Sequence, residues 1–346
     1  MGKGLYYIND IIGLVEKNNS DTILVGHQQA LVKIFLSGIC GTDISIIEKG
    51  TKWLKDKFRA PVILGHEFIG EVIAVGDKNY KNFIGKKVVA NSISSCGVCW
   101  DCNNGYYDSC SNSKQLGFNV DGCFSDKIVL DISQLKEVPD CGVNDELFVL
   151  SEPLGCAFKA VLSVKEEIKG KNILICGLGS IGYFIGCVAR LFEANIIIGI
   201  DPINSRRLCA TKAVIKNTKV FSLVGNPVNL ALSGDKYDLV FEASGDLSIT
   251  LNYVTKFLKS YGKIVAIGRE NKKSSIDFNA YIDKQLSLIF VRGHVEKKCV
   301  DLAINFIENY PEIIANDFYK IFLMADYKIA FDAAINKSFN KVFIKP

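Results

Sequence analysis

The chain has 346 residues, 49% of them hydrophobic and 23% charged, which is long enough for two domains with buried cores and argues against a disordered protein. Its 41 basic and 37 acidic residues give a formal charge of +4 without a block of one sign, and this argues against nucleic acid as the main partner. The first residues lack an apolar stretch of signal-peptide length, so we expect a cytoplasmic protein with no membrane partner.

The first third of the chain predicts a mostly β domain. Short apolar or alternating runs lie between glycine-containing turns at 31–35, 68–75, 87–90 and 127–129. From about residue 168 the pattern changes. Strand patterns at 172–176, 195–200, 220–223, 239–243, 263–267 and 286–291 alternate with helical patterns, notably at 181–192, 205–213 and 249–258. This alternation predicts an α/β fold with a parallel sheet covered on both faces, followed by a helix at 299–309 and mixed strand and helix.

The uncharged stretch Ile173–Ala189 resembles a short membrane span. Four glycines within ten residues interrupt it, at the point where a strand should turn into a helix. We therefore interpret it as part of a buried strand, turn and helix.

That turn has the sequence Gly177-Leu178-Gly179-Ser180-Ile181-Gly182. A G-x-G-x-x-G motif between a strand and a helix is typical of dinucleotide binding, because glycines allow a tight turn and close approach to a pyrophosphate. Asp201 ends the next predicted strand, where a carboxylate can bind a ribose hydroxyl, and this favours NAD. Arg206 and Arg207 could instead serve the extra phosphate of NADP.

Cysteine spacing predicts a first zinc site. Cys96, Cys99, Cys102 and Cys110 lie within fifteen residues in a polar segment, a pattern typical of a closed, structural four-thiolate site. A redox role for these thiols is the alternative.

A second candidate metal site comprises Cys40, in Gly38-Ile39-Cys40-Gly41-Thr42-Asp43, and His66 with Glu67. One thiolate, one imidazole and one carboxylate would leave a zinc ion open to substrate.

These motifs, together with Ser151-Glu152-Pro153-Leu154, occur in an order and spacing that resemble the zinc-containing medium-chain dehydrogenases, and within them the sorbitol or polyol dehydrogenase branch. The resemblance implies a GroES-like catalytic domain at 1–152 and 295–346, and a Rossmann NAD-binding domain, with a doubly wound parallel sheet, at 153–294. It implies an active site between the domains and two zinc ions per chain, one catalytic and one structural.

By the same resemblance, Cys40 and His66 would be ligands of the catalytic zinc, and Glu67 and Glu152 would bind it directly or through water. Asp43 would orient His66, and Thr42 would take the alcohol proton. The resemblance further implies that four residues lie along the cofactor: Ile181, Asp201, Arg206 and Arg292.

Two positions depart from the pattern of related enzymes. Ser45 stands where many relatives carry a histidine, so the proton would leave through Ser45, the cofactor ribose or water. Ser92 replaces a bulky aromatic residue of the liver-type enzymes, which suggests a roomier and more polar pocket.

We therefore expect an NAD- and zinc-dependent oxidoreductase that acts on a polyol, sugar alcohol or secondary alcohol, as a homodimer or homotetramer. The basic stretch Lys49–Arg59 is interpreted as a solvated loop or as a contact for a phosphorylated or acidic sugar. The alternatives are a threonine or butanediol type of dehydrogenase, an amino-cyclitol dehydrogenase, and a non-catalytic NAD-binding protein of the same fold.

Overall fold

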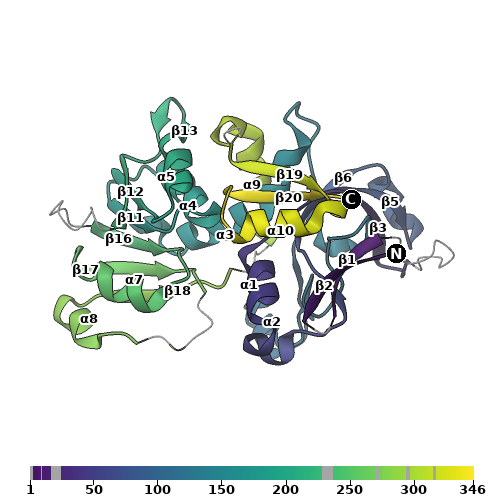
Figure 1. Cartoon of the computed structure of the whole chain (residues 1–346), viewed down its shortest axis with the longest axis horizontal. Helices are drawn as coiled ribbons and strands as arrows, with labels where there is room; N and C mark the ends of the chain where they lie inside the picture. The colour runs from purple at the N-terminus through teal and green to yellow at the C-terminus, as the bar shows by residue number, and fades with distance from the viewer. Residues whose placement is uncertain are drawn as a thin grey trace. The chain divides into compact units, whose positions relative to one another are not determined.

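The computed structural model describes residues 3–8, 10–16, 25–227, 237–269, 273, 275–293, 297–314 and 317–346. The chain divides into two compact units (Figure 1). Unit 1 comprises Met1–Gly155, His294–Pro311 and Tyr319–Pro346, and unit 2 comprises Cys156–Gly293 and Glu312–Phe318. The domain limits inferred above stay a prediction; the observed division assigns the segment Glu312–Phe318 to unit 2.

Unit 1 is mostly β structure, as expected. Its main sheet has the order β10-β6-β5-β3-β20-β19, with β9 also paired to β3. These strands are β3 (Gln29–Gly38), β5 (Glu67–Val75), β6 (Lys87–Ala90), β9 (Lys127–Asp131), β10 (Leu135–Glu137), β19 (Tyr319–Leu323) and β20 (Lys341–Lys345). Smaller sheets contain β1 (Lys3–Ile8), β2 (Ile11–Glu16) and β4 (Val62–Ile63), and then β7 (Ile93–Ser94) and β8 (Lys114–Gln115).

Helices cover parts of this unit. They are α1 (Gly41–Lys49), α2 (Trp100–Asn103), α9 (Lys297–Asn309) and α10 (Tyr327–Ile335), while α3 (Ser151–Leu162) begins in unit 1 and continues into unit 2. Short 3-10 turns occur at Lys52–Lys57, Lys78–Phe83, Tyr107–Ser109, Ile132–Gln134, Asp145–Leu150, Lys165–Glu167, Pro311–Ile313 and Met324–Asp326. The core lies between the sheets and includes the fully buried side chains of Leu5, Ile46, Ile63 and Phe124.

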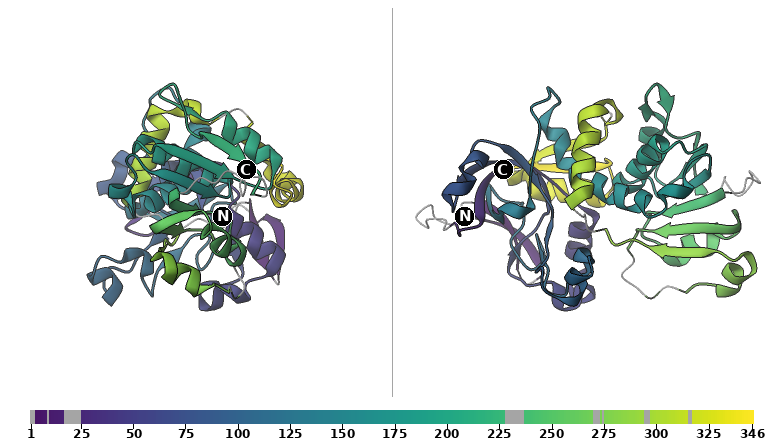
Figure 2. Two further views of the ribbon diagram at one scale, coloured as in Figure 1. Left: turned by 90° about the vertical axis from the view of Figure 1, so that its left-hand side faces the viewer. Right: turned by 180° about the vertical axis from the view of Figure 1, so that it is seen from behind.

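Unit 2 contains the predicted parallel sheet, with strand order β15-β12-β11-β16-β17-β18 (Figures 1 and 2). The strands are β11 (Asn172–Cys176), β12 (Ile196–Ile200), β15 (Leu223–Gly225), β16 (Tyr237–Glu242), β17 (Leu258–Ala266) and β18 (Ser287–Phe290). The helices are α4 (Ser180–Leu191), α5 (Asn204–Thr211), α7 (Leu247–Val254) and α8 (Phe278–Lys284), and β13 (Val214–Ile215) pairs with β14 (Thr218–Lys219).

The order reverses between β11 and β16. Since crossovers between parallel strands are right-handed, α4 and α5 cover one face, and α7 and α8 cover the other. This doubly wound arrangement is the predicted Rossmann-like fold, and ligands of such sheets bind at the carboxyl ends of the strands next to the reversal.

The stretch Ile173–Ala189 is a buried strand, a glycine turn and most of α4, as predicted. Among the described residues, no helix combines the length and the apolar character that a membrane span requires.

Two element predictions in unit 2 were wrong in extent. The strand expected at 220–223 pairs only from Leu223, because Phe221 is buried through packing near α4 instead, with its ring 6.2 Å from that of Tyr183. The helix expected at 249–258 ends at Val254, and Leu258 already belongs to β17. The exposed residues Lys259–Tyr261 at the start of that strand hide its alternating pattern.

Candidate functional site

The four clustered cysteines gather at one point of unit 1. Cys99 is the residue preceding α2, Cys102 lies on that helix, and Cys110 follows the next turn. The sulfur-sulfur distances are 3.5 Å for Cys96–Cys110 and for Cys99–Cys102, 3.8 Å for Cys99–Cys110 and 4.0 Å for Cys96–Cys102. A tetrahedral zinc site with metal-sulfur bonds of about 2.3 Å has sulfur atoms about 3.8 Å apart. The donor set therefore fits a structural zinc ion.

These thiols differ in their surroundings. The backbone N–H of Cys102 donates to the Cys99 sulfur and lowers the pKa of Cys99 to about 6, whereas burial raises the pKa of Cys102 to about 12. A cation that withdraws electron density from all four sulfurs would favour the thiolate form of each.

A second cluster brings together Cys40, His66 and Glu67, whose potential ligand atoms all lie within 4.8 Å of one another. His66 is 6% exposed and Glu67 1%. The Nδ1 atom of His66 has no hydrogen-bond partner. Buried polar atoms without a partner are costly unless a metal or ligand satisfies them, so this site also fits a zinc ion.

The local sequence explains this geometry. Gly38 ends β3 and pairs with Glu67 at the start of β5. A Cβ atom at Gly38 would lie 2.3 Å from Oε2 of Glu67, so only glycine leaves room for that carboxylate. Gly65 has a φ of +92°, and a Cβ there would lie 2.6 Å from the ring of Phe124. Glycine is therefore required immediately before His66.

The helix α1 carries the residues to which a proton-transfer role was assigned. Cys40 precedes the helix, and its backbone N–H donates to Oδ2 of Asp43 at 2.9 Å. Thr42 Oγ1 lies 3.8 Å from the Cys40 sulfur. Ser45 is three residues after Thr42, so both side chains project from the same side of α1. The start of α1 therefore brings the Thr42 hydroxyl near the metal-site thiol, with Ser45 about one turn further along the helix.

Asp43 is fully buried, and burial raises its pKa. Its Oδ1 atom is 3.9 Å from Nδ1 of His66, too long for a hydrogen bond. The observed contact of Asp43 is the cap of α1, and its orientation of His66 stays a prediction.

Glu152, in the first turn of α3, is 7% exposed and accepts a hydrogen bond from the Ser92 hydroxyl at 3.2 Å. Burial raises the pKa of Glu152 to about 7, and Glu67 adds to the increase, while His66 and Ser92 oppose it. Ser92 is itself only 1% exposed. Its hydroxyl is therefore engaged with Glu152, and this qualifies the expectation that Ser92 makes the pocket more polar.

Lys341 is a member of this site that the sequence reasoning missed. It is 5% exposed, lies on β20, and its Nζ atom is 2.6 Å from Oε1 and 2.5 Å from Oε2 of Glu67. The β20–β3 register, with Phe343 opposite Gly38, brings Lys341 level with Cys40. Burial lowers the pKa of Lys341, but Glu67 and the other acidic groups outweigh this effect and raise it. A lysine directly before the apolar run Val342–Ile344 of the C-terminal strand was the available signal.

In unit 2, the glycine motif links β11 to α4 as predicted. Gly177 has a φ of +92°, and a Cβ at Gly182 would lie 1.8 Å from the carbonyl oxygen of Gly177. Gly179 precedes α4, whose N-terminus bears Ser180 and Ile181. The turn therefore brings bare backbone to the start of a helix, which is an arrangement that fits a pyrophosphate.

Asp201 follows β12 and is 2% exposed. Its carboxylate accepts hydrogen bonds from the backbone N–H groups of Leu178 at 2.8 Å and Ile203 at 2.7 Å. The guanidinium of Arg206 lies 3.5 Å from the same carboxylate. A Cβ atom at Gly179 would lie 3.4 Å from that guanidinium. Arg292 follows β18 at the same carboxyl edge of the sheet. The structure thus brings Asp201 and Arg206 to the glycine turn.

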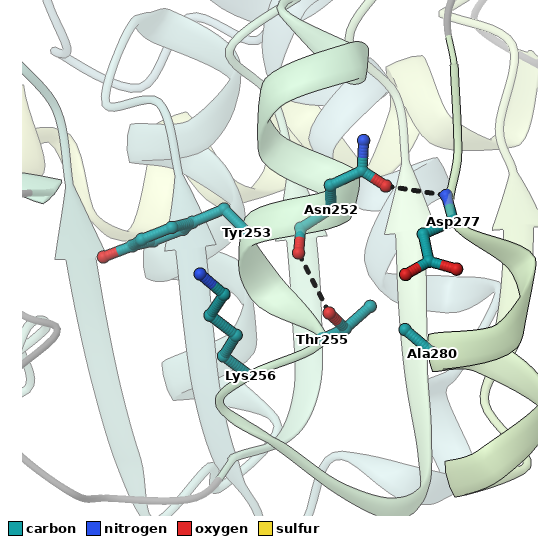
Figure 3. A pocket seen from close by; sticks show the side chains of 6 residues that line it. All are labelled: Asn252, Tyr253, Thr255, Lys256, Asp277 and Ala280. Atoms are coloured by element: carbon teal, nitrogen blue, oxygen red, sulfur yellow. Dashed lines mark hydrogen bonds between the residues drawn. The ribbon is translucent and has the colours of Figure 1, made fainter.

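Two other features remain, a basic stretch in unit 1 and a pocket in unit 2. The basic stretch Lys49–Arg59 ends α1 and forms a 3-10 turn, with Lys49, Lys52, Lys57 and Arg59 exposed. An open pocket of about 550 Å³ lies between α7 and α8 (Figure 3). Its lining contains none of the predicted site residues, so we assign it no role in the reaction.

The two units together define the class of protein. One is a GroES-like β unit with two zinc-type donor sets, and the other is a Rossmann-like unit with a glycine turn. Residues 26–140 match the alcohol dehydrogenase GroES-like domain. An L-threonine 3-dehydrogenase of Pectobacterium carotovorum subsp. carotovorum is 30% identical over 281 residues, covering 80% of this chain and 78% of that protein.

Solved structures support the same fold. An alcohol dehydrogenase of Escherichia coli CFT073 in complex with NADH is 22% identical with a TM-score of 0.84, covering 99% of both chains. Galactitol-1-phosphate dehydrogenase of Escherichia coli is 19% identical with a TM-score of 0.84, covering 99% of this chain and all of that one. The chain belongs to the zinc-containing medium-chain dehydrogenase family and is an oxidoreductase of that family.

Proposed function

We propose that the protein oxidises a secondary alcohol, with a polyol or sugar alcohol as the first candidate substrate, and that it uses zinc and NAD. The observation that carries this proposal is the cluster of Cys40, His66 and Glu67, in which the buried Nδ1 atom of His66 has no hydrogen-bond partner. A closed structural site or an inert fold has no need of an open donor set of this kind.

In this proposal Cys40 and His66 hold the catalytic zinc, and Glu67 and Glu152 bind it directly or through water. The bound zinc would act as a Lewis acid on the substrate oxygen, and the nicotinamide of NAD would accept the hydride. Lys341 balances the charge of Glu67, and Ser92 orients Glu152. The observed contacts of the two carboxylates differ: Glu67 pairs with the Lys341 ammonium, and Glu152 accepts a hydrogen bond from the Ser92 hydroxyl.

Proton transfer is assigned to α1. Thr42 would accept the proton of the substrate hydroxyl while its own proton moves on, and Ser45 on the same side of the helix would pass a proton towards water. This role is inferred from the Thr42–Cys40 contact of 3.8 Å and from the helical spacing. A Thr42→Val variant should lose most of its kcat yet bind zinc normally; unchanged kcat would exclude the role.

NAD is proposed over NADP because the Asp201 carboxylate, beside the glycine turn, would repel a 2′-phosphate. Arg206 weakens this repulsion, since its guanidinium is 3.5 Å from that carboxylate. Titration of the protein with NADH and with NADPH, followed by fluorescence, tests the preference. We expect at least about tenfold tighter binding of NADH, and the opposite order would assign Arg206 to the phosphate.

Threonine is the second candidate substrate, favoured by the 30% identity to an L-threonine 3-dehydrogenase. Polyols and threonine are both oxidised at a secondary alcohol, so the same donor set serves either. The two substrate classes differ in the groups that the pocket must recognise: a carboxylate and an amine for threonine, and several hydroxyls for a polyol.

The deciding experiment follows NADH formation by the zinc-loaded protein with sugar alcohols, their phosphates, diols, L-threonine and cyclitols. Cys40→Ser removes a proposed catalytic ligand, and Cys141→Ser removes an exposed thiol as the matched control. Activity with one class that only Cys40→Ser abolishes supports the proposal and identifies the substrate. Bound zinc and NADH without turnover of any alcohol would favour a non-catalytic protein.

We also propose a homodimer or homotetramer. Among the described strands, β18 lies at the edge of its sheet, with Phe290 67% exposed, and the side chains of Phe278 and Ile282 on α8 are similarly exposed. Unpaired edges with apolar residues favour association. Light scattering coupled to gel filtration tests the proposal, and a monomer at micromolar concentration would refute it.

A further inference from the structure

Glu242 is a buried acid that the mechanism above does not use. It is fully buried and is the last residue of β16, where it pairs in register with Cys176 of β11. The strand order reverses between these two strands, so Glu242 stands where a doubly wound sheet binds its ligand.

The acid holds the turn that follows its own strand. Its Oε1 atom accepts hydrogen bonds from the Ser244 backbone N–H at 2.9 Å and from the Ser244 hydroxyl. The backbone N–H of Gly245 also interacts with the carboxylate. Two donors of Ser244 therefore converge on one side chain, with the Gly245 N–H close by, and this fixes the turn at Ser244–Gly245.

The same residue holds the segment after β17. Its carbonyl oxygen accepts hydrogen bonds from the N–H groups of Ile267 and Gly268, each at 2.9 Å. A Cβ at Gly268 would lie 2.3 Å from Oε2 of Glu242, so this segment packs directly against the carboxylate. Glu242 thus connects two loops at the carboxyl edge of the sheet.

The turn held by Glu242 in turn supports the glycine motif. A Cβ at Gly177 would lie 2.7 Å from both the Cα and the N atoms of Ser244. A shift of the Ser244 backbone would therefore change its packing against Gly177, the first residue of the proposed pyrophosphate turn.

The burial of the Glu242 carboxylate lowers the stability of the fold. Oε2 of Glu242 is buried without a hydrogen-bond partner, and burial raises the pKa of Glu242 despite the donors on Oε1. A glutamine or a smaller apolar residue would avoid that cost, so the carboxylate has another use.

We propose that Glu242 is a positioning residue of the dinucleotide site, where its carboxylate fixes the Ser244–Gly245 turn against Gly177 and so shapes the backbone that receives the cofactor. The inference rests on the proposed function, since it takes the glycine turn of unit 2 to bind a nicotinamide dinucleotide. Glu242 belongs to unit 2, whereas both zinc donor sets belong to unit 1, and it is given no part in the chemical step.

The test compares Glu242→Ala and Glu242→Gln with the zinc-loaded wild-type protein. NADH binding is measured by fluorescence, KM for NAD and for the alcohol by steady-state kinetics, and stability by thermal unfolding. We expect Glu242→Ala to raise the Kd for NADH about tenfold to a hundredfold, the effect of losing hydrogen bonds to a charged group. The kcat at saturating NAD should change little, and Glu242→Gln, which keeps one acceptor oxygen, should bind NADH more tightly than Glu242→Ala.

A matched control separates positioning from stability. The hydroxyl of Tyr281, also buried in unit 2, donates to the carbonyl of Leu251 at 3.0 Å. Tyr281→Phe should lower the melting temperature and leave the Kd for NADH unchanged. If Glu242 acts through the turn, adding Ser244→Ala to Glu242→Ala should weaken binding little further.

Two results would overturn the inference and are distinguishable. Wild-type protein that binds neither NADH nor NADPH refutes the proposed function together with this role. Wild-type protein that binds NADH, with Glu242→Ala binding equally well, refutes the role of Glu242 alone.

Discussion

Replacing Lys341 by methionine should destabilise unit 1 far more than the loss of an ordinary ion pair. Methionine keeps most of the length of the side chain and removes only the charge. In the zinc-free protein, Glu67 would then be left as a 1% exposed carboxylate that has lost its ammonium partner. Removing one partner of a buried pair costs about 3–5 kcal/mol, because the remaining charge stays desolvated.

The chain supplies its own control. Lys86 and Glu137 form a pair of similar length, 2.7 Å, but their side chains are 48% and 51% exposed. Water solvates both groups after either is removed, so Lys86→Met should cost only about 0.2–1 kcal/mol. The two substitutions are identical in chemistry and differ in burial.

Tryptophan fluorescence can follow this effect in unit 1 specifically, since both tryptophans of the chain, Trp53 and Trp100, belong to that unit. With a slope of about 2–3 kcal/mol per molar urea, a loss of about 3–5 kcal/mol lowers the unfolding midpoint by about 1–2.5 M. Glu67→Gln in the Lys341→Met background should restore part of the loss. Equal midpoints for Lys341→Met and Lys86→Met would refute the argument that the buried pair carries this energy.

Three further predictions concern zinc and pH. Cys99→Ser should leave the protein with one zinc ion fewer per chain and a lower melting temperature, measured by mass spectrometry of the metal and by calorimetry, while Cys141→Ser should change neither. In the zinc-free protein, burial raises the pKa of Glu152 to about 7. Zinc affinity should therefore rise with pH through about 7, because this carboxyl loses its proton there. Glu152→Gln should flatten that part of the affinity profile, and an unaltered profile would exclude Glu152 from the site. Burial raises the pKa of Asp238, but the hydrogen bonds from the Asn172 N–H and Lys259 outweigh this effect and lower the pKa. The ionised Asp238 carboxylate therefore stabilises the fold above the unfolded pKa of about 3.9, and this stabilisation is lost as the pH falls through the lower folded pKa. Asp238→Asn should therefore cost about 1–2 kcal/mol at pH 7 and progressively less as the pH falls below about 3.9, and a difference that does not shrink in acid would contradict this sign.

The sequence was most informative where a signal is local. The predicted strands 87–90 and 172–176 coincide with β6 and β11, because a short apolar run bounded by glycine or polar turns has few other solutions. The glycine motif similarly predicted a strand, a turn and a helix in that order. Each of these predictions depends on residues within about twenty positions of one another.

Some elements were missed. The strands β1 and β2 form a hairpin in which Asp10 adopts a positive φ of 63°; the apolar residues Tyr6–Ile8 and Ile11–Ile12 on either side were a signal that the sequence analysis did not use. The helix α1 is short, and its capping by Cys40 and Asp43 does not follow the usual serine or threonine pattern.

The candidate metal site shows why one part of a site is readable and another is not. Its donors come from motifs at the end of β3 and the start of β5, which the register of Gly38 with Glu67 brings face to face. The residue that balances their charge comes from β20, at a separation of 274 residues from Glu67. Only sheet pairing creates that contact, and no local pattern encodes it.

The role of glycine at position 38 follows from the same geometry. β3 lies between β5 and β20, so a side chain at its last residue would stand between Glu67 and Lys341: the missing Cβ would be 2.3 Å from Oε2 of one and 3.2 Å from Cε of the other. Gly38, two residues before the metal-site Cys40, is therefore needed for the contact between Glu67 and Lys341, which lies on the last strand of the chain. Because glycine in a strand often marks a close approach of other groups, Gly38 is better interpreted as a requirement for space than as a turn, and it then indicates that buried groups meet beside it.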